Sequence, residues 1–171
     1  SGNWSQSSGD RSAFGMSVEQ VMKVITRIKV NNYLDCLVLQ HSHLGSQIPD
    51  IIEIRKATQE ACRFFSEICK QGAPLQYLDL GGGLGVDYTG EQKSSLNSIN
   101  YSLDEYCINI IETVKYELDQ SEINHPIIVT ESGRACIASS SMLIFNILET
   151  TNFDSDKKQE INSNDHPLLK N

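Results

Sequence analysis

The stretch that decides the fold is Leu78-Asp79-Leu80-Gly81-Gly82-Gly83-Leu84-Gly85-Val86-Asp87-Tyr88. Its apolar start, Tyr77 to Leu80, ends abruptly in three consecutive glycines, which is typical of a buried strand entering a loop from which side chains are excluded. Backbone N–H groups in such a loop can closely approach an anion, most often a phosphate. Three glycines alone do not separate this interpretation from a tight strand-to-helix turn without a ligand.

Two common phosphate-binding loops are excluded. A dinucleotide fingerprint needs G-x-G-x-x-G, and Val86 stands where the third glycine belongs. A P-loop ends in Gly-Lys-Ser/Thr, and no such sequence follows the glycines.

The composition indicates a globular protein with a real core. The chain has 171 residues, of which 39% are hydrophobic and 21% charged. A net charge of −8 argues against a nucleic-acid partner, which needs a basic face. No apolar run approaches the roughly 20 residues of a membrane span, and no signal peptide is visible, so we expect no membrane partner and a cytoplasmic location.

The five cysteines are scattered and form no C-x-x-C motif. This number and spacing predict reduced, mostly buried thiols in a cytosolic protein rather than a disulfide framework.

Helical and strand patterns alternate along the chain. The sequence predicts helices that begin with capping boxes at Ser17, Asp50 and Ser102, the second ending at Gly72. Apolar runs predict four strands: Leu34 to Gln40, Leu75 to Leu80, Pro126 to Thr130 and Met142 to Leu148. Residues 85 to 101 read as a long loop.

This order predicts an α/β fold whose parallel sheet is covered on both faces. Polar and glycine motifs follow three successive strands, at the carboxyl ends where parallel α/β folds bind ligands.

Several side chains at these strand ends have the right chemistry for a site. His41 and His43 lie two residues apart, so they share a face, as a metal pair or as hydrogen-bonded core histidines. Glu131 follows the third strand and either caps a helix or faces a cation. Arg134 either pairs with Glu131 or faces an anion. Pyridoxal phosphate suits the whole set, because it needs glycine amides, a hydroxyl and an arginine for its phosphate, a flat partner for its ring and a carboxylate for its pyridine nitrogen.

At these motifs the sequence resembles the pyridoxal-phosphate decarboxylases of the ornithine/diaminopimelate/arginine group, over roughly Ser8 to Glu149. Residues 41–47, HSHLGSQ, are close to the H-F-H-L-G-S-Q of the biosynthetic arginine decarboxylases. The glycine loop continues as GLGVDY, followed by SINY at 98–101, and the third motif is E-S-G-R where the other branches usually carry E-P-G-R.

The resemblance implies roles for individual residues. His43 stacks on the cofactor ring and Glu131 pairs with the pyridine nitrogen, which makes these two the expected catalytic residues. Ser46 and the amides of Gly81, Gly82 and Gly83 hold the cofactor phosphate with support from Arg134, and Gly133 also belongs to the expected cofactor-binding residues. Residues Leu78 to Tyr88 form the stretch that the family associates with substrate binding. The implied reaction is decarboxylation of L-arginine to agmatine in polyamine biosynthesis.

The resemblance also implies a domain plan. Residues 1–142 correspond to about three β-α units of a pyridoxal-phosphate-binding (β/α)8 barrel, which takes about 250 residues when complete. Residues 143–149 form a strand that leads to a C-terminal β domain, and residues 150–171 form a polar linker or the start of an insertion. The lysine that holds the cofactor is expected upstream, so this polypeptide alone is expected to be inactive.

The remaining expectations from the family are a small amino-acid substrate, a homo-oligomeric full-length protein and magnesium, for which no site is visible in this sequence. Three alternatives stay open. One is a sister decarboxylase for ornithine or diaminopimelate, another is a non-catalytic pyridoxal-phosphate-binding barrel, and the last is a metal-dependent barrel hydrolase that uses His41 and His43.

Overall fold

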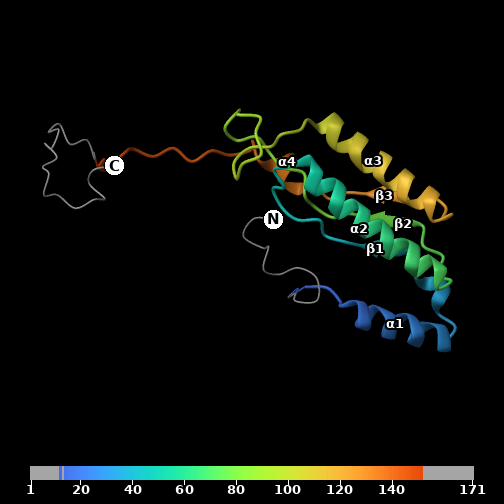
Figure 1. The fold of residues 1–171 in the computed structure, drawn as a ribbon. Helices are drawn as coiled ribbons and strands as arrows, with labels where there is room; N and C mark the ends of the chain where they lie inside the picture. Colours follow the sequence, from blue (N-terminus) through green and yellow to red (C-terminus); the bar gives the residue numbers. More distant parts are fainter. Residues whose placement is uncertain (1–11, 13, 152–171) are drawn as a thin grey trace, which may run out of the picture. The chain divides into compact units, whose positions relative to one another are not determined.

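The computed structural model describes residue 12 and residues 14–151 (Figure 1). The chain divides into two units, Ser1–Ser140 and Ser141–Asn171. Within the described residues the first unit contains, in chain order, α1 (Val18–Val30), β1 (Leu39–His41), α2 (Ile51–Lys70), β2 (Tyr77–Asp79), α3 (Leu103–Gln120), β3 (Ile127–Val129) and α4 (Gly133–Ile137).

The strands form a parallel sheet in the order β1-β2-β3, with β2 in the centre. Leu78 of β2 is level with Gln40 of β1 and Ile128 of β3. Successive side chains of a strand point to opposite faces, so these three share one face of the sheet. The preceding and following residue of each strand lie on the other face.

One face of the sheet packs against α2 and α3 (Figure 1). Leu78 is fully buried there, and Gln40 Nε2 donates a hydrogen bond of 3.0 Å to the carbonyl oxygen of Ala61 in α2. Each large apolar side chain that is fully buried in this core contributes about 1.5–3 kcal/mol. The helices supply Ile54, Ala61, Cys62, Phe65, Tyr106, Ile110, Val114 and Leu118.

The opposite face of the sheet is open in the described residues. Leu39 and Ile127 on that face are 44% and 60% exposed. The expectation of two covered faces is therefore wrong for this part of the chain. The physical reason is that right-handed crossovers that proceed in one direction along a sheet place every helix on the same side.

The predicted helix starts are confirmed, with one difference. Ser17 and Ser102 form complete capping boxes with Gln20 and Glu105. Asp50 caps α2 by accepting from Ile52 N–H at 2.9 Å, so the expected box is only half formed there.

All three strands of the sheet are shorter than the apolar runs that predict them, and two other segments differ from expectation. The first strand begins later, because residues 34–36 form a 3-10 turn. Residues 143–149, expected to form a strand, have no strand partner among the described residues and form no helix or strand; a ladder needs a neighbour. The sequence also gave no sign of α4, a five-residue helix directly after Glu131 and Ser132.

The five cysteines are free thiols, but they are not mostly buried. Cys36, Cys107 and Cys136 are exposed, and Cys62 is fully buried. Burial raises the pKa of Cys62 to about 12, so this thiol stays protonated and is not a nucleophile.

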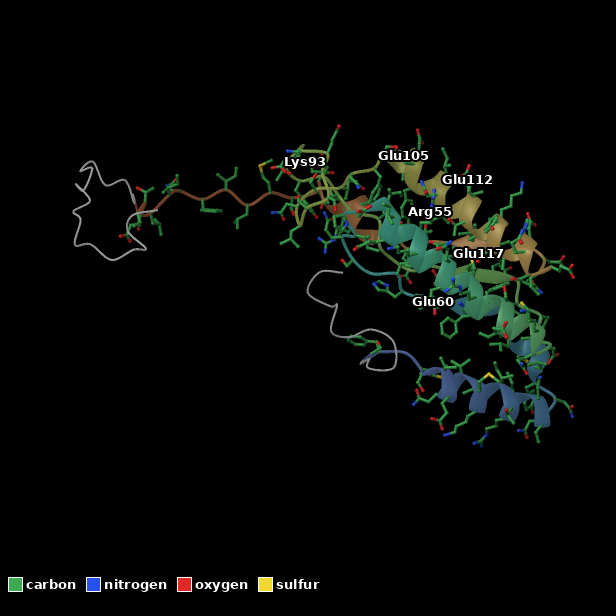
Figure 2. The ribbon with its side chains drawn as sticks, viewed as in Figure 1. Arg55, Glu60, Lys93, Glu105, Glu112 and Glu117 are labelled. Atoms are coloured by element: carbon green, nitrogen blue, oxygen red, sulfur yellow. The ribbon has the colours of Figure 1, made fainter. Side chains whose placement is uncertain are left out.

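The outer surfaces of α2 and α3 are charged. Figure 2 shows Arg55 and Glu60 on α2, and Glu112 and Glu117 on α3. Gln59 Nε2 donates to Glu117 Oε1 at 3.0 Å, and Arg55 Nε donates to Asn109 Oδ1 at the same distance, so polar contacts border the apolar seam between the two helices. In the part of the chain that is described, no helix has the length and apolar character that crossing a membrane requires.

Two adjacent isoleucines of α3 test which side of this helix packs into the core. Ile110 is 3% exposed and Ile111 is 58% exposed. We expect Ile110→Ala to lower the free energy of unfolding by ~2–5 kcal/mol, because it leaves a cavity, and Ile111→Ala to lower it by less than about 1 kcal/mol. Urea denaturation of the protein that contains this chain measures both. Equal losses would show that α3 buries its other side as well.

Candidate functional site

Polar groups meet at the carboxyl edge of the open face. His41 at the end of β1 and Asp79 at the end of β2 are register partners, and Glu131 follows Val129 of β3 by two residues. His41 Nδ1 lies 2.7 Å from Asp79 Oδ2 and 4.0 Å from Glu131 Oε1. Because an ionised carboxylate can only accept, Nδ1 of His41 carries the proton in the shorter contact.

Asp79 is held in its ionised form. Burial raises the pKa of Asp79, but hydrogen bonds from the His41 ring and from Gly81 N–H, together with the charges of His41 and His43, outweigh this effect and lower the pKa below its ordinary value. Asp79 therefore fixes the ring of His41 on one side and the first glycine of the loop on the other.

Backbone hydrogen bonds extend past the three strands into the loops that follow. Leu44 N–H donates to Leu80 O at 3.2 Å, and Glu131 N–H donates to Gly81 O at 2.9 Å. The loops after β1 and β3 are thus tied to the loop after β2, which fixes the relative positions of residues far apart in sequence.

Gly81 is required by its surroundings. Its φ of +62° lies in the left-handed region, and a Cβ at this position would lie 2.9 Å from His43 Nδ1 and 3.0 Å from His43 Cα. The missing side chain lets the His43 backbone lie directly against the loop.

Two side chains, the half-buried Gln47 and the buried Tyr101, join the loop after β1 to the glycine loop. Gln47 Nε2 donates to Val86 O at 2.7 Å, and Gln47 Oε1 accepts from Val86 N–H at 2.9 Å. Tyr101 accepts from Gly85 N–H at 3.0 Å and donates to Ile48 O at 2.7 Å. Burial raises the pKa of Tyr101, so its hydroxyl keeps the proton that it donates. Sequence reasoning assigned no role to Gln47 or Tyr101, because it does not show which backbone groups a distant side chain meets.

A pocket of about 300 Å³ lies between these loops and α4. It brings together eight of the residues predicted for the site and three of their neighbours. Its lining consists of His43, Gly45, Ser46, Gln47, Gly82, Gly83, Leu84, Glu131, Ser132, Gly133 and Arg134.

Arg134 of α4 connects two loops at this pocket. Its Nη2 donates to Ser46 Oγ at 3.1 Å, and its Nη1 donates to Tyr88 OH at 3.2 Å. The guanidinium is thus held by a hydroxyl from the loop after β1 and a hydroxyl from the loop after β2.

Residues 78–88, the stretch predicted to bind the substrate, lie partly in the core and partly at the pocket. Leu78 and Leu80 are fully buried in the core, so their side chains are not available to a substrate. Gly82, Gly83 and Leu84 line the pocket, whereas Gly81 and Tyr88 are not part of its lining. The role of residues 78–88 in substrate binding stays a prediction.

The pair His41 and His43 does not form a metal cluster in the described residues. The group within reach of one cation consists of His41, Asp79 and Glu131, whose ligand atoms lie within 4.8 Å of one another. The hydrogen bond between His41 and Asp79 accounts for this proximity, and we assign no metal to it.

Comparison with known proteins identifies the family. Residues 1–138 match the family described as pyridoxal-dependent decarboxylase, pyridoxal binding domain. The chain therefore belongs to this family, and the resemblance that the motifs indicate is confirmed.

The relatives have more specific names. The chain is 47% identical over 165 residues to the biosynthetic arginine decarboxylase of Prochlorococcus marinus (strain MIT 9312). This match covers 94% of this chain and 26% of the relative. It is 42% identical over 149 residues to the biosynthetic arginine decarboxylase of Trichlorobacter lovleyi. This second match covers 87% of this chain and 24% of the relative. The chain thus spans about a quarter of the length of these relatives.

Solved structures show the same relationship. The biosynthetic arginine decarboxylase SpeA from Campylobacter jejuni matches with a TM-score of 0.64 and 35% identity, over 71% of this chain and 21% of that chain. Diaminopimelate decarboxylase from Helicobacter pylori complexed with L-lysine matches with a TM-score of 0.56 and 25% identity, over 74% of this chain and 28% of that chain.

Two glycines with similar backbone angles test the contact with His43. Gly81→Ala creates both backbone strain and a clash, whereas Gly90, with φ +72°, has no atom within 4 Å of an added Cβ. We expect Gly81→Ala to lower the free energy of unfolding by about 1–3 kcal/mol more than Gly90→Ala does, because only the former overpacks its surroundings. Chemical denaturation of both variants measures the difference. Equal losses of unfolding free energy would mean that His43 moves aside without destabilising the fold.

Proposed function

We propose that the protein containing this chain is a pyridoxal-phosphate-dependent carboxy-lyase that converts L-arginine to agmatine and carbon dioxide, and that this chain supplies part of its active site. The observation that carries the proposal is the pocket in which Ser46, Arg134 and the glycine loop meet His43 and Glu131. A volume of about 300 Å³ is at the small end for ligand pockets and is compatible with a cofactor.

The residues fit the phosphate of this cofactor. Arg134 contributes a permanent positive charge, and Ser46 contributes a hydroxyl 3.1 Å from it. At Gly82 a Cβ would lie 3.2 Å from Gly45 O and from His43 Cε1, so a larger residue would crowd the cradle. The phosphate would therefore sit among Ser46, Arg134 and the N–H groups of the glycine loop, with Gly133 at the same wall.

The residues also fit the ring. His43 offers a flat side chain that lines the pocket, and Glu131 offers a carboxylate on the opposite loop. When bound, pyridoxal phosphate supplies an electron sink for the electron pair that remains after carbon dioxide leaves. In this arrangement Glu131 would hold a proton on the ring nitrogen, and His43 would stack on the ring.

Arginine is favoured as the substrate over the sister amino acids. The relatives named biosynthetic arginine decarboxylase reach 47% identity over nearly the whole chain, whereas the diaminopimelate decarboxylase structure reaches 25%. Ornithine or diaminopimelate decarboxylation is the second candidate, supported by that structural likeness.

We infer that the sheet is part of a (β/α)8 barrel. The support is that α2 and α3 cover one face while polar groups collect at the carboxyl edge of the other, as in a barrel whose helices form an outer ring. The open face then becomes barrel interior, and residues 143–149 would gain a strand partner in the β domain. The open sheet face and the unpaired residues 143–149 both call for further protein segments, which supports a homo-oligomer.

Two further expectations remain part of the proposal. Free thiols at all five cysteines support a reducing compartment such as the cytoplasm. Magnesium is an expectation from the family alone, and we assign it no site among the described residues.

Replacement of Glu131 tests the proposal. In the full-length protein we expect Glu131→Gln to reduce carbon dioxide release from arginine by about 100-fold, because an amide cannot hold the ring proton by charge. Glu112→Gln, an exposed change on the outer side of α3, is the matched control and should leave the rate unchanged (Figure 2).

The same assay separates the alternatives. Release from ornithine or diaminopimelate instead of arginine would overturn the substrate. Cofactor binding without release from any of the three amino acids would indicate a non-catalytic barrel. Bound zinc in place of the absorbance of pyridoxal phosphate would indicate a metal-dependent hydrolase.

A further inference from the structure

Tyr88 closes the glycine loop, and its hydroxyl faces Arg134. Arg134 Nη1 donates to Tyr88 OH at 3.2 Å while Nη2 donates to Ser46 Oγ at 3.1 Å. Tyr88 is not part of the pocket lining, whereas Arg134 and Ser46 are. Tyr88 therefore contacts the guanidinium without being part of the pocket lining.

The loop holds Tyr88 firmly in this position. Tyr88 N–H donates to Asn97 O at 2.9 Å, which closes the loop across nine residues of sequence. The neighbouring Asp87 accepts from Ser98 Oγ at 2.7 Å, from Gly90 N–H at 2.9 Å and from Gln92 N–H at 3.1 Å. The Ser98 hydroxyl in particular, with the backbone donors, lowers the pKa of Asp87, so the carboxylate remains ionised and keeps these bonds.

Arg134 needs such support because of where it lies. It is exposed and belongs to α4, a helix of only five residues. A free arginine has many rotamers, and ordering it on binding costs affinity. The hydroxyls of Tyr88 and Ser46 each accept from one terminal nitrogen of the guanidinium, so they hold Arg134 in one orientation before a ligand binds.

We propose that Tyr88 is a positioning residue for the cofactor phosphate, which it serves by holding the guanidinium of Arg134. The proposal rests on the proposed function, because it takes the phosphate of pyridoxal phosphate as the anion at Arg134. It assigns Tyr88 to the cofactor, although the family resemblance places residues 78–88 with the substrate. The phenol ring itself is half exposed and needs no contact with either ligand.

The test uses the full-length protein with Tyr88→Phe, which removes only the hydroxyl. We expect the Kd for pyridoxal phosphate, measured by absorbance titration of the apoprotein, to rise about three- to tenfold. The Ki of inorganic phosphate, measured as a competitor of the cofactor, should rise by a similar factor. At saturating cofactor the KM for arginine should stay within about twofold of the wild-type value. Tyr116→Phe removes an exposed hydroxyl on α3 and is the matched control.

A double-mutant cycle shows whether Tyr88 acts through Arg134. In an Arg134→Gln background, Tyr88→Phe should raise the Kd by less than about twofold, because the group that it positions is gone. Additive effects would overturn the proposal, and so would an unchanged Kd or a higher KM for arginine with normal cofactor binding. Those outcomes leave the proposed function intact, whereas a wild-type protein that does not bind pyridoxal phosphate would refute the function and this inference together.

Discussion

The site depends on the central strand β2 and on the backbone ladder that continues beyond it. Leu78 fixes the strand in the core, because it is fully buried between the helices and the sheet. The next residues, Asp79 to Gly81, then accept backbone hydrogen bonds from the loops on both sides. A single short segment thereby sets the positions of His43 on one loop and Glu131 on the other. A shift of β2 by one residue would turn Asp79 into the core and Leu78 onto the open face.

The side-chain contacts around the pocket reinforce this ladder. Gln47 imitates a strand partner for Val86, since its amide both donates and accepts. Tyr101 joins two buried backbone groups that would otherwise lack partners, and an unpaired group in such a place costs about 1–3 kcal/mol. The irregular loops are therefore as well determined as the helices, although they carry no repeating pattern. Preorganised groups of this kind are what a cofactor pocket requires.

Local signals in the sequence predicted much of this arrangement. Helix starts at Ser17, Asp50 and Ser102 depend on side chains within three residues, so they can be read directly. The motifs also predicted that Ser46, Glu131 and the glycine loop would gather at one edge, because parallel strands end together. Neither strand ends nor α4 could be predicted well, since short elements depend on neighbours in space more than on their own composition. The contacts of Gln47 and Tyr101 were not predictable for the same reason.

The order of the strands has a consequence for how the chain acquires its structure. Each strand of the sheet pairs with the next one along the chain, and one helix closes each crossover. The paired strands are nevertheless far apart in sequence, since Leu39 pairs with Tyr77 and Tyr77 pairs with Ile127, so each pairing has to wait for its crossover helix. A ribosome that has released β1, α2 and β2 has delivered one parallel pair of strands and the helix that joins them. The next unit can then add to an existing edge, so the pocket at the strand ends is assembled progressively during synthesis.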